Sequence, residues 1–270
     1  MNVIKANKQK EPFSEEKVIQ SIQRARIPKS LQAETLAHVK TKLYDGISTE
    51  EIYQHILEFL DASPHPYSKA RYSLKEAIMM LGPTGYPFED FISQLLESDG
   101  YKTKVRQILS GKCITHEVDV VAEKDGKTAM IEAKFHNSPG VRSEVQVALY
   151  THARFEDVKL KNKLDEAWLV TNTKTTIDAN LYAQCSEMKV LSWDYPQGGG
   201  LRELIEKTQL YPVTMLTSLS QANKLSLLNN HIVHCKQIAA DNNVLNVLPL
   251  SQEDREKTLA EVTFICTNQT

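Results

Sequence analysis

The sequence is nearly without net charge. Its 32 Lys and Arg residues stand against 34 Asp and Glu residues, which gives a formal charge of −2 at pH 7. A domain that binds nucleic acid through a basic surface carries a clear excess of Lys and Arg. Any contact with a polyanion must therefore come from local geometry. We expect non-specific affinity for DNA to be weak and to fall with added salt.

Cysteine pairs, a leader segment and long apolar runs are also missing. The four cysteines are widely spaced and include no Cys-x-x-Cys pair, so neither a disulfide framework nor a zinc ribbon is expected. The N-terminus is polar, and no run approaches the roughly 20 apolar residues of a membrane helix. We expect a cytoplasmic protein without a membrane partner.

The chain divides into three segments, which predict three domains. Residues 1–79 combine a short β pattern with helices, one of which starts at a capping box from Ser48 to Glu51. Residues 87–207 alternate strand and helix patterns, as in an α/β fold. Residues 211–270 show no strand pattern and predict short helices. The stretch 82–87, rich in Gly and Pro, is the best candidate for a linker.

Element boundaries follow from the apolar spacing and the turn residues. In the first segment a last helix is expected over Ser68–Met80, after a break at Pro64 and Pro66. In the central segment, strands are expected near 101–109, 116–123, 128–135, 167–171 and 190–193, with helices from Phe88 and near 142–155 and 176–187.

A β-hairpin in the central segment brings acidic residues together. Asp125-Gly126 between alternating apolar residues predicts a two-residue turn. Counting outward from that turn places Asp119 opposite Glu132, with Lys134 on the same face. Directly opposed side chains have Cβ atoms about 5 Å apart, so two carboxylates there repel each other. A divalent cation between them would reverse the sign of that interaction.

A purely structural interpretation of these residues stays open. Glu117 falls opposite Lys134 in the same register and could form an ordinary cross-strand ion pair, with Asp119 and Glu132 on a solvated face. The pattern (Asp/Glu)-x-Lys occurs five times in the chain, so it means little alone. Only the copy at Glu132 lies on an apolar strand with an acid placed to oppose it.

The central segment resembles the PD-(D/E)xK nucleases, and within them the Mrr-type restriction endonucleases. The resemblance covers about 87–207. It rests on features in a fixed order: Phe88-Glu89 in the first helix, Gly100-Tyr101, Gly111, Glu117-Val118-Asp119, Glu132-Ala133-Lys134-Phe135, and Gln146 with Tyr150 in a QxxxY motif.

That resemblance implies metal-dependent cleavage of DNA phosphodiester bonds. Asp119, Glu132 and the backbone carbonyl of Ala133 would hold Mg²⁺ or Mn²⁺. Lys134 would act on the attacking water or the scissile phosphate. Glu89 would assist the metal, although an acid in the first turn of a helix is also favoured by the helix dipole. Gln146 would help to orient the reacting groups.

The first segment resembles the ATP-cone, a regulatory nucleotide-binding module, over nearly all of 1–79. The matching text includes Val3-Ile4-Lys5, Glu11-Pro12-Phe13-Ser14, Lys17, Ile47 to Ile52 and Ala70-Arg71-Tyr72. The resemblance implies binding of ATP or dATP by Val3, Lys5, Glu11, Lys17 and Thr49. Ala6 departs from the family, which usually has a basic residue there. The chain contains no Gly-x-x-x-x-Gly-Lys sequence, so sensing of a nucleotide is expected rather than its hydrolysis.

The last segment resembles helix-hairpin-helix units, which present a hairpin to the DNA backbone. Its hairpin positions, Ser218–Ala222 and Asn229–His231, contain no glycine. A small helical packing or oligomerisation domain is an equally good interpretation, and a homodimer stays open.

The predicted fold class is α/β: a small α+β ATP-cone, a restriction-endonuclease-like mixed sheet flanked by helices, and a small all-α, helix-hairpin-helix-like module. The predicted function is a metal-dependent endodeoxyribonuclease of restriction type, regulated by ATP or dATP. Two alternatives remain. One is a DNA-repair or junction-resolving nuclease, and the other is a non-catalytic, nucleotide-responsive DNA-binding protein.

Overall fold

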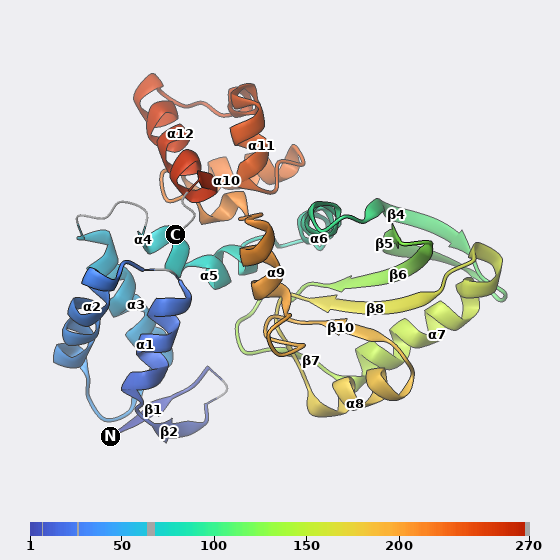
Figure 1. The fold of residues 1–270 in the computed structure, drawn as a ribbon, viewed down its shortest axis with the longest axis horizontal. Helices are drawn as coiled ribbons and strands as arrows, with labels where there is room; N and C mark the ends of the chain where they lie inside the picture. Colours follow the sequence, from blue (N-terminus) through green and yellow to red (C-terminus); the bar gives the residue numbers. More distant parts are fainter. Residues whose placement is uncertain (7, 26, 64–67, 268–270) are drawn as a thin grey trace.

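The computed structural model describes residues 1–6, 8–25, 27–63 and 68–267 (Figure 1). A small N-terminal unit, a central sheet with helices on both faces and a helical C-terminal unit follow one another along the chain (Figure 1). The predicted α/β class, with a mixed central sheet and an all-helical end, is confirmed. Within the described ranges, no helix is long and apolar enough to cross a bilayer.

The N-terminal unit is a three-stranded sheet covered by helices. The sheet order is β2-β1-β3, with β1 antiparallel to β2 and parallel to β3. Ser14 caps α1 by accepting a hydrogen bond from the N–H of Lys17, and the predicted capping box between Ser48 and Glu51 is present at α3. The elements are β1 (Asn2–Ile4), β2 (Lys10–Pro12), α1 (Glu15–Arg24), α2 (Lys29–Lys42), β3 (Ile47–Ser48) and α3 (Thr49–Asp61).

The helix expected over Ser68–Met80 is two helices, α4 (Ser68–Tyr72) and α5 (Leu74–Met79). They separate at Ser73, whose hydroxyl donates a hydrogen bond to the carbonyl of Ala70. Such side-chain to backbone bonds compete with regular helix geometry. The expected break at Pro64 and Pro66 lies outside the described residues.

The stretch 82–87 connects α5 to the next helix through close contacts. The side-chain amide of Asn137 donates to the carbonyl of Pro83 at 3.2 Å. A Cβ built on Gly82 would lie 2.6 Å from a ring carbon of Phe135. Only glycine fits there, and the connection packs against the segment that follows the third strand of the central sheet.

The central sheet has the order β10-β8-β6-β5-β4. The pairs β4–β5 and β5–β6 are antiparallel, whereas β6–β8 and β8–β10 are parallel. The strands and the first helix match the predicted positions closely. They are α6 (Tyr86–Ser98), β4 (Lys102–Ser110), β5 (Thr115–Lys124), β6 (Lys127–Lys134), β8 (Glu166–Thr171) and β10 (Lys189–Leu191).

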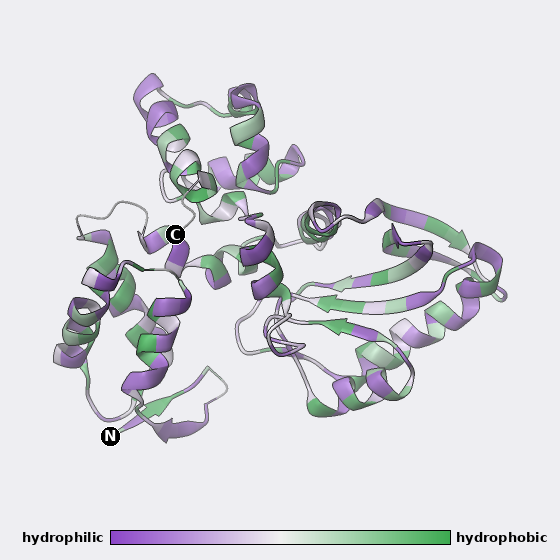
Figure 2. Cartoon of the chain, in the orientation of Figure 1, coloured by the Kyte–Doolittle hydropathy of each residue, from purple (hydrophilic) through white to green (hydrophobic). Residues whose placement is uncertain are grey.

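The strands of this sheet are rich in hydrophobic residues (Figure 2). Their side chains enter two separate cores, one on each face, and helices cover both faces (Figure 1). Ala129 and Ile131 share a core with α6, while Met130 points into a second core with the other helices. Those helices are α7 (Val145–Asn162) and α8 (Ile177–Cys185), and α9 (Leu201–Thr208) packs on the α6 side. Two very short strands, β7 (Arg142–Ser143) and β9 (Lys174–Thr175), form a separate parallel pair that the sequence did not predict.

The described part of the C-terminal unit, residues 211–267, consists mainly of helices. Its residues Leu227 and Ile265 belong to the same apolar core as Ala77 of α5 and Phe91 of α6. The fully buried carboxylate of Glu261 accepts hydrogen bonds from the backbone N–H groups of Thr217 and Ser218, at the first expected hairpin position. The elements are η1 (Val213–Met215), α10 (Gln221–Asn229), α11 (Cys235–Ala240), η2 (Asn242–Val247) and α12 (Gln252–Thr267).

Candidate active site

The β5–β6 hairpin forms with the predicted register. Pairing runs from Lys124 opposite Lys127 to Val120 opposite Ile131. Asp125 and Gly126 have φ values of +51° and +77°, as a type I′ turn requires. One step beyond the last pair, Asp119 meets the end of β6, where its Oδ2 accepts a hydrogen bond of 2.7 Å from the N–H of Ala133.

The two carboxyl groups at this end of the hairpin lie in a largely buried environment. Burial raises the pKa of Glu132 to about 7, and the charge of Asp119 acts in the same direction. Burial also raises the pKa of Asp119. The positive charge of Lys134, exposed at the end of β6, opposes both shifts. The site therefore concentrates negative charge that a cation would stabilise.

Arg154 of α7 is a member of this site that sequence reasoning missed. Its Nη1 donates to Oε2 of Glu132, and both side chains are nearly buried. Its guanidinium carbon lies 5.2 Å from the centre of the Tyr150 ring. Gln146, Tyr150 and Arg154 are spaced by four residues along α7 and so follow one helix face. Gln146 and Tyr150 are exposed, and extending their spacing by one turn would have indicated Arg154.

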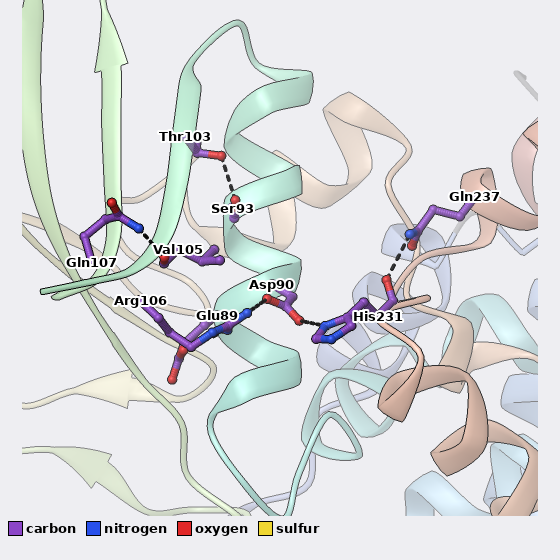
Figure 3. A network of polar contacts seen from close by, with 9 residues as sticks. All are labelled: Glu89, Asp90, Ser93, Thr103, Val105, Arg106, Gln107, His231 and Gln237. Atoms are coloured by element: carbon purple, nitrogen blue, oxygen red, sulfur yellow. Dashed lines mark hydrogen bonds and ion pairs between the residues drawn. The ribbon is translucent and has the colours of Figure 1, made fainter. Parts of the chain in front are cut away.

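Glu89 lies on α6, on the other side of the sheet, and its carboxyl group is still influenced by the charge of Asp119. Its side chain is buried, and burial together with the charge of Asp119 raises its pKa to about 7. Nη1 of Arg106 donates to Oε2 of Glu89 at 3.1 Å, and Nη2 donates to Oδ1 of Asp90 at 2.7 Å (Figure 3). Arg106 sits across from Asp119, between the pairs Val105–Val120 and Gln107–Val118.

Asp90 extends this network to the C-terminal unit. Its Oδ2 lies 2.8 Å from Nδ1 of His231, and Nε2 of Gln237 donates to the carbonyl of His231 at 3.0 Å (Figure 3). A chain of contacts thus runs from α11 through Asp90 of α6 to Arg106, the residue that faces Asp119. This contact could not be predicted from the sequence, since 141 positions separate Asp90 from His231.

The predicted metal ligands are suited to a small hard cation. Across the described residues, no group of three or more His, Cys, Asp and Glu side chains is arranged around a common point. The predicted set is smaller, with two carboxylates and the carbonyl of Ala133. Oδ2 of Asp119 and Oε2 of Glu132 are engaged, while Oδ1 and Oε1 accept no hydrogen bond from a described residue. Carboxylate oxygens are the ligands that Mg²⁺ and Mn²⁺ prefer, so these residues fit such an ion.

The residues predicted to bind a nucleotide lie on the small N-terminal sheet, on the turn after β1, and on the helices α1 and α3. Nζ of Lys5 and Nζ of Lys17 lie 2.7 and 3.0 Å from Oε2 of Glu11. These hydrogen bonds, Lys5 first, lower the pKa of Glu11. Thr49 is the first residue of α3 and lines a cavity together with Lys5. Val3 lies apart from this group, in the core of the N-terminal unit.

Comparison with known proteins shows which kinds of domain the chain contains. Family models match three successive stretches: an ATP cone domain over 1–77, a restriction endonuclease domain over 82–197, and an AF1548-like C-terminal domain over 211–266. The chain thus carries a restriction-endonuclease-like domain between an ATP cone and a helical domain.

Two relatives assign the chain to a particular family. An uncharacterized protein of Archaeoglobus fulgidus is 38% identical over 171 residues, 63% of this chain and 97% of that protein. A crystal structure of a protein of unknown function, AF1548, is 36% identical with a TM-score of 0.59, and the match covers 68% of this chain and 98% of that one. The chain belongs to the AF1548-like family.

Proposed function

We propose that the protein is a metal-dependent endodeoxyribonuclease of restriction type, regulated by ATP or dATP bound to its ATP cone. The observation that carries the proposal is the meeting of Asp119 and Glu132 at the end of the β5–β6 hairpin, with Lys134 beside them. Two acids in adjacent positions of a largely buried site destabilise the fold unless a cation is present. Such an arrangement is typical of a functional site.

Each residue has a distinct role in this proposal. A bound Mg²⁺ or Mn²⁺ would supply an activated water and stabilise charge on the phosphate. Asp119 and Glu132 hold the ion, and Lys134 contacts the scissile phosphate or orients the attacking water. Glu89, with a pKa of about 7, can take up or release a proton near neutral pH. Arg154 orients Glu132, and Arg106 orients Glu89.

Separate measurements of metal binding and cleavage test these roles. Asp119→Ala should abolish both Mn²⁺ binding, followed by calorimetry, and cleavage of duplex DNA. Lys134→Ala should retain Mn²⁺ binding but slow cleavage by about 100-fold or more, because it removes only stabilisation of the reacting groups. Glu123→Gln is the matched control, since Glu123 is an exposed acid on the same strand. Full activity of either Asp119→Ala or Lys134→Ala, in a folded protein, would contradict the assignment.

A non-catalytic, nucleotide-responsive DNA-binding protein is the second candidate. The ion pair between Arg154 and Glu132 favours it, because a resident guanidinium already neutralises one proposed ligand. Calorimetry distinguishes the two. If neither the wild-type protein nor Glu132→Ala binds Mn²⁺, the result would support the second candidate. A panel of plain, methylated, branched and single-stranded DNA would separate a restriction enzyme from a repair or junction-resolving nuclease.

A further inference from the structure

A cavity of about 360 Å³ lies between the ATP cone and the restriction-endonuclease-like domain. The ATP cone contributes Lys5, Thr49 and Lys75, and the second domain contributes Arg142, Lys174 and Trp193. Small-molecule sites commonly enclose roughly 300–1,000 Å³. The cavity therefore has the size of a ligand site, and it opens beside two of the residues predicted to bind a nucleotide.

Two cations of the second domain face each other in this cavity. Arg142 of β7 and Lys174 of β9 are directly paired positions of the two-stranded parallel sheet. Like charges at paired positions destabilise a sheet unless something neutralises them. Lys174 forms an ion pair with Asp194, whereas Arg142 forms none with any described residue. An anion bound between them would remove the repulsion.

Lys75 adds a third positive charge from the ATP-cone side. Its Nζ lies 4.3 Å from the centre of the Trp193 ring and donates to the carbonyl of Asn172 at 2.5 Å. Burial lowers the pKa of Lys75 to about 7, and the charge of Lys174 acts in the same direction. A cation in this position is stabilised by any anion that enters the cavity.

The two domains approach each other closely at the rim. A Cβ built on Gly140, whose φ is +81°, would lie 3.3 Å from Cβ of Ala6. A long basic side chain in place of Ala6 would meet this loop. Arg142, two residues after Gly140, brings positive charge to the same rim from the other domain.

We propose that the phosphates of a nucleoside triphosphate bind in this cavity on cations from both domains, Lys5 and Lys75 from the ATP cone and Arg142 and Lys174 from the restriction-endonuclease-like domain. Trp193 lines the same cavity and offers an aromatic face to the base. The proposal rests on the nucleotide regulation proposed above and adds that the nuclease domain completes the site. The exposed pairs Lys5–Glu11 and Lys174–Asp194 are weak enough for phosphate to compete with the acids.

The same contacts connect the cavity to the candidate active site. Lys75 holds the carbonyl of Asn172, and the side chain of Asn172 bonds both the N–H and the carbonyl of His136, each at 2.9 Å. His136 follows Lys134 by two residues. A nucleotide that draws Lys75 and Arg142 together therefore acts on the segment that leaves β6, and its binding should change the cleavage rate.

Calorimetric titration of the full chain with ATP and with dATP tests the proposal. Arg142→Ala and Lys174→Ala should each raise the Kd about tenfold, as expected when one charge-assisted contact is lost. Arg142→Lys should retain most of the affinity. Lys102→Ala is the matched control, because Lys102 is an exposed lysine of β4, at the far edge of the sheet. Tryptophan fluorescence should change on binding in wild type and not in Trp193→Phe.

The outcomes separate this proposal from the function on which it rests. If Lys5→Ala weakens binding while Arg142→Ala and Lys174→Ala leave the Kd unchanged, the shared cavity is overturned and binding to the ATP cone alone remains. If wild-type protein binds neither ATP nor dATP, both the shared cavity and the nucleotide regulation are overturned. Metal-dependent cleavage, measured without nucleotide, is unaffected by either result.

Discussion

At the scale of single residues, Arg106 shows how the candidate site is held. It lies within β4 with a φ of +50°, a left-handed conformation that costs a residue with a side chain about 1–2 kcal/mol. Its guanidinium group bonds two buried carboxylates, Glu89 and Asp90. Backbone strain of this kind is often found at functional sites. Because Arg106 pairs with both carboxylates, its charge is directed to the interior and not to solvent.

Arg106→Ala should lower the free energy of unfolding by about 2 kcal/mol. Breaking a fully buried ion pair costs about 3–5 kcal/mol. Arg106 is 26% exposed and Glu89 and Asp90 are not fully sealed from solvent, so the loss should be smaller. Urea denaturation measures it, with Lys104→Ala, an exposed lysine on the same strand, as the control. Equal stability of Arg106→Ala and wild type would show that the two acids do not need this partner.

If Glu132 holds a metal ion as proposed, Arg154 competes with that ion for the same carboxylate. Arg154→Gln should therefore tighten Mn²⁺ binding by about fivefold, because about 1 kcal/mol of cation repulsion is removed. Calorimetry with Mn²⁺ measures the Kd, and circular dichroism verifies that the variant is folded. Unchanged or weaker Mn²⁺ binding would place the ion away from Glu132.

At the scale of elements, local signals decided what could be predicted. The Asp125-Gly126 turn fixes the register of β5 against β6, so the approach of Asp119 to the end of β6 followed from counting. No comparable signal marks β7 and β9, since two-residue strands have no periodicity. The contact between Arg154 and Glu132 depends on how α7 crosses the sheet, which apolar spacing does not specify. The roles of the predicted metal and nucleotide ligands stay predictions.

The start of α11 should give the fold a measurable pH dependence. His234 is buried just before this helix, and burial, with the charge of Lys236, lowers its pKa to about 4. A histidine in the unfolded chain titrates near 6.5. Between these values the unfolded chain binds more protons than the folded one. The contribution of His234 to the free energy of unfolding should therefore fall by up to about 3 kcal/mol as the pH falls from about 6.5 to 4. The raised pKa values of Glu89 and Glu132 act in the opposite direction over this range.

Urea denaturation across this pH range checks the contribution of His234. His234→Phe removes the titrating group and should make the free energy of unfolding fall less, or rise more, than in wild type as the pH falls from about 6.5 to 4. His55→Gln, a change at a half-buried histidine of α3, should leave the profile as in wild type. A profile that His234→Phe does not alter would assign the pH dependence to other groups.

At the scale of the whole molecule, one apolar core joins the three parts, while most of the N-terminal unit has a second core of its own. Helix α5, the α6 face of the sheet and the C-terminal helices share a single apolar core. Apolar spacing predicted the helices but not the segments against which they pack. The apolar stripe of a helix has the same spacing whichever segment covers it. The family models match 1–77, 82–197 and 211–266, and the boundaries of the three domains stay a prediction.

Charge at this scale predicts weak DNA binding that depends on a few lysines. Lys102 and Lys104 are exposed on β4, at one edge of the sheet. Replacing both by Ala should weaken duplex binding and reduce the slope of log affinity against log salt by about 2, close to one unit for each lost phosphate contact. Binding by fluorescence anisotropy at several salt concentrations tests this. The control is the single exchange Lys163→Ala, at a lysine beyond the end of α7. An unchanged slope in the double variant would show that DNA does not bind at this edge of the sheet.

Cleavage of covalently closed circular DNA tests the central claim most directly, because such DNA has no ends and only an endonuclease can open it. The measurement is the rate of conversion to nicked or linear DNA in Mn²⁺, with wild type, Asp119→Ala and Glu123→Gln side by side. Conversion by wild type and Glu123→Gln, stopped by a chelator and absent in folded Asp119→Ala, is the predicted result. Conversion that persists in Asp119→Ala, or no conversion by metal-loaded wild type on any DNA form, would contradict it.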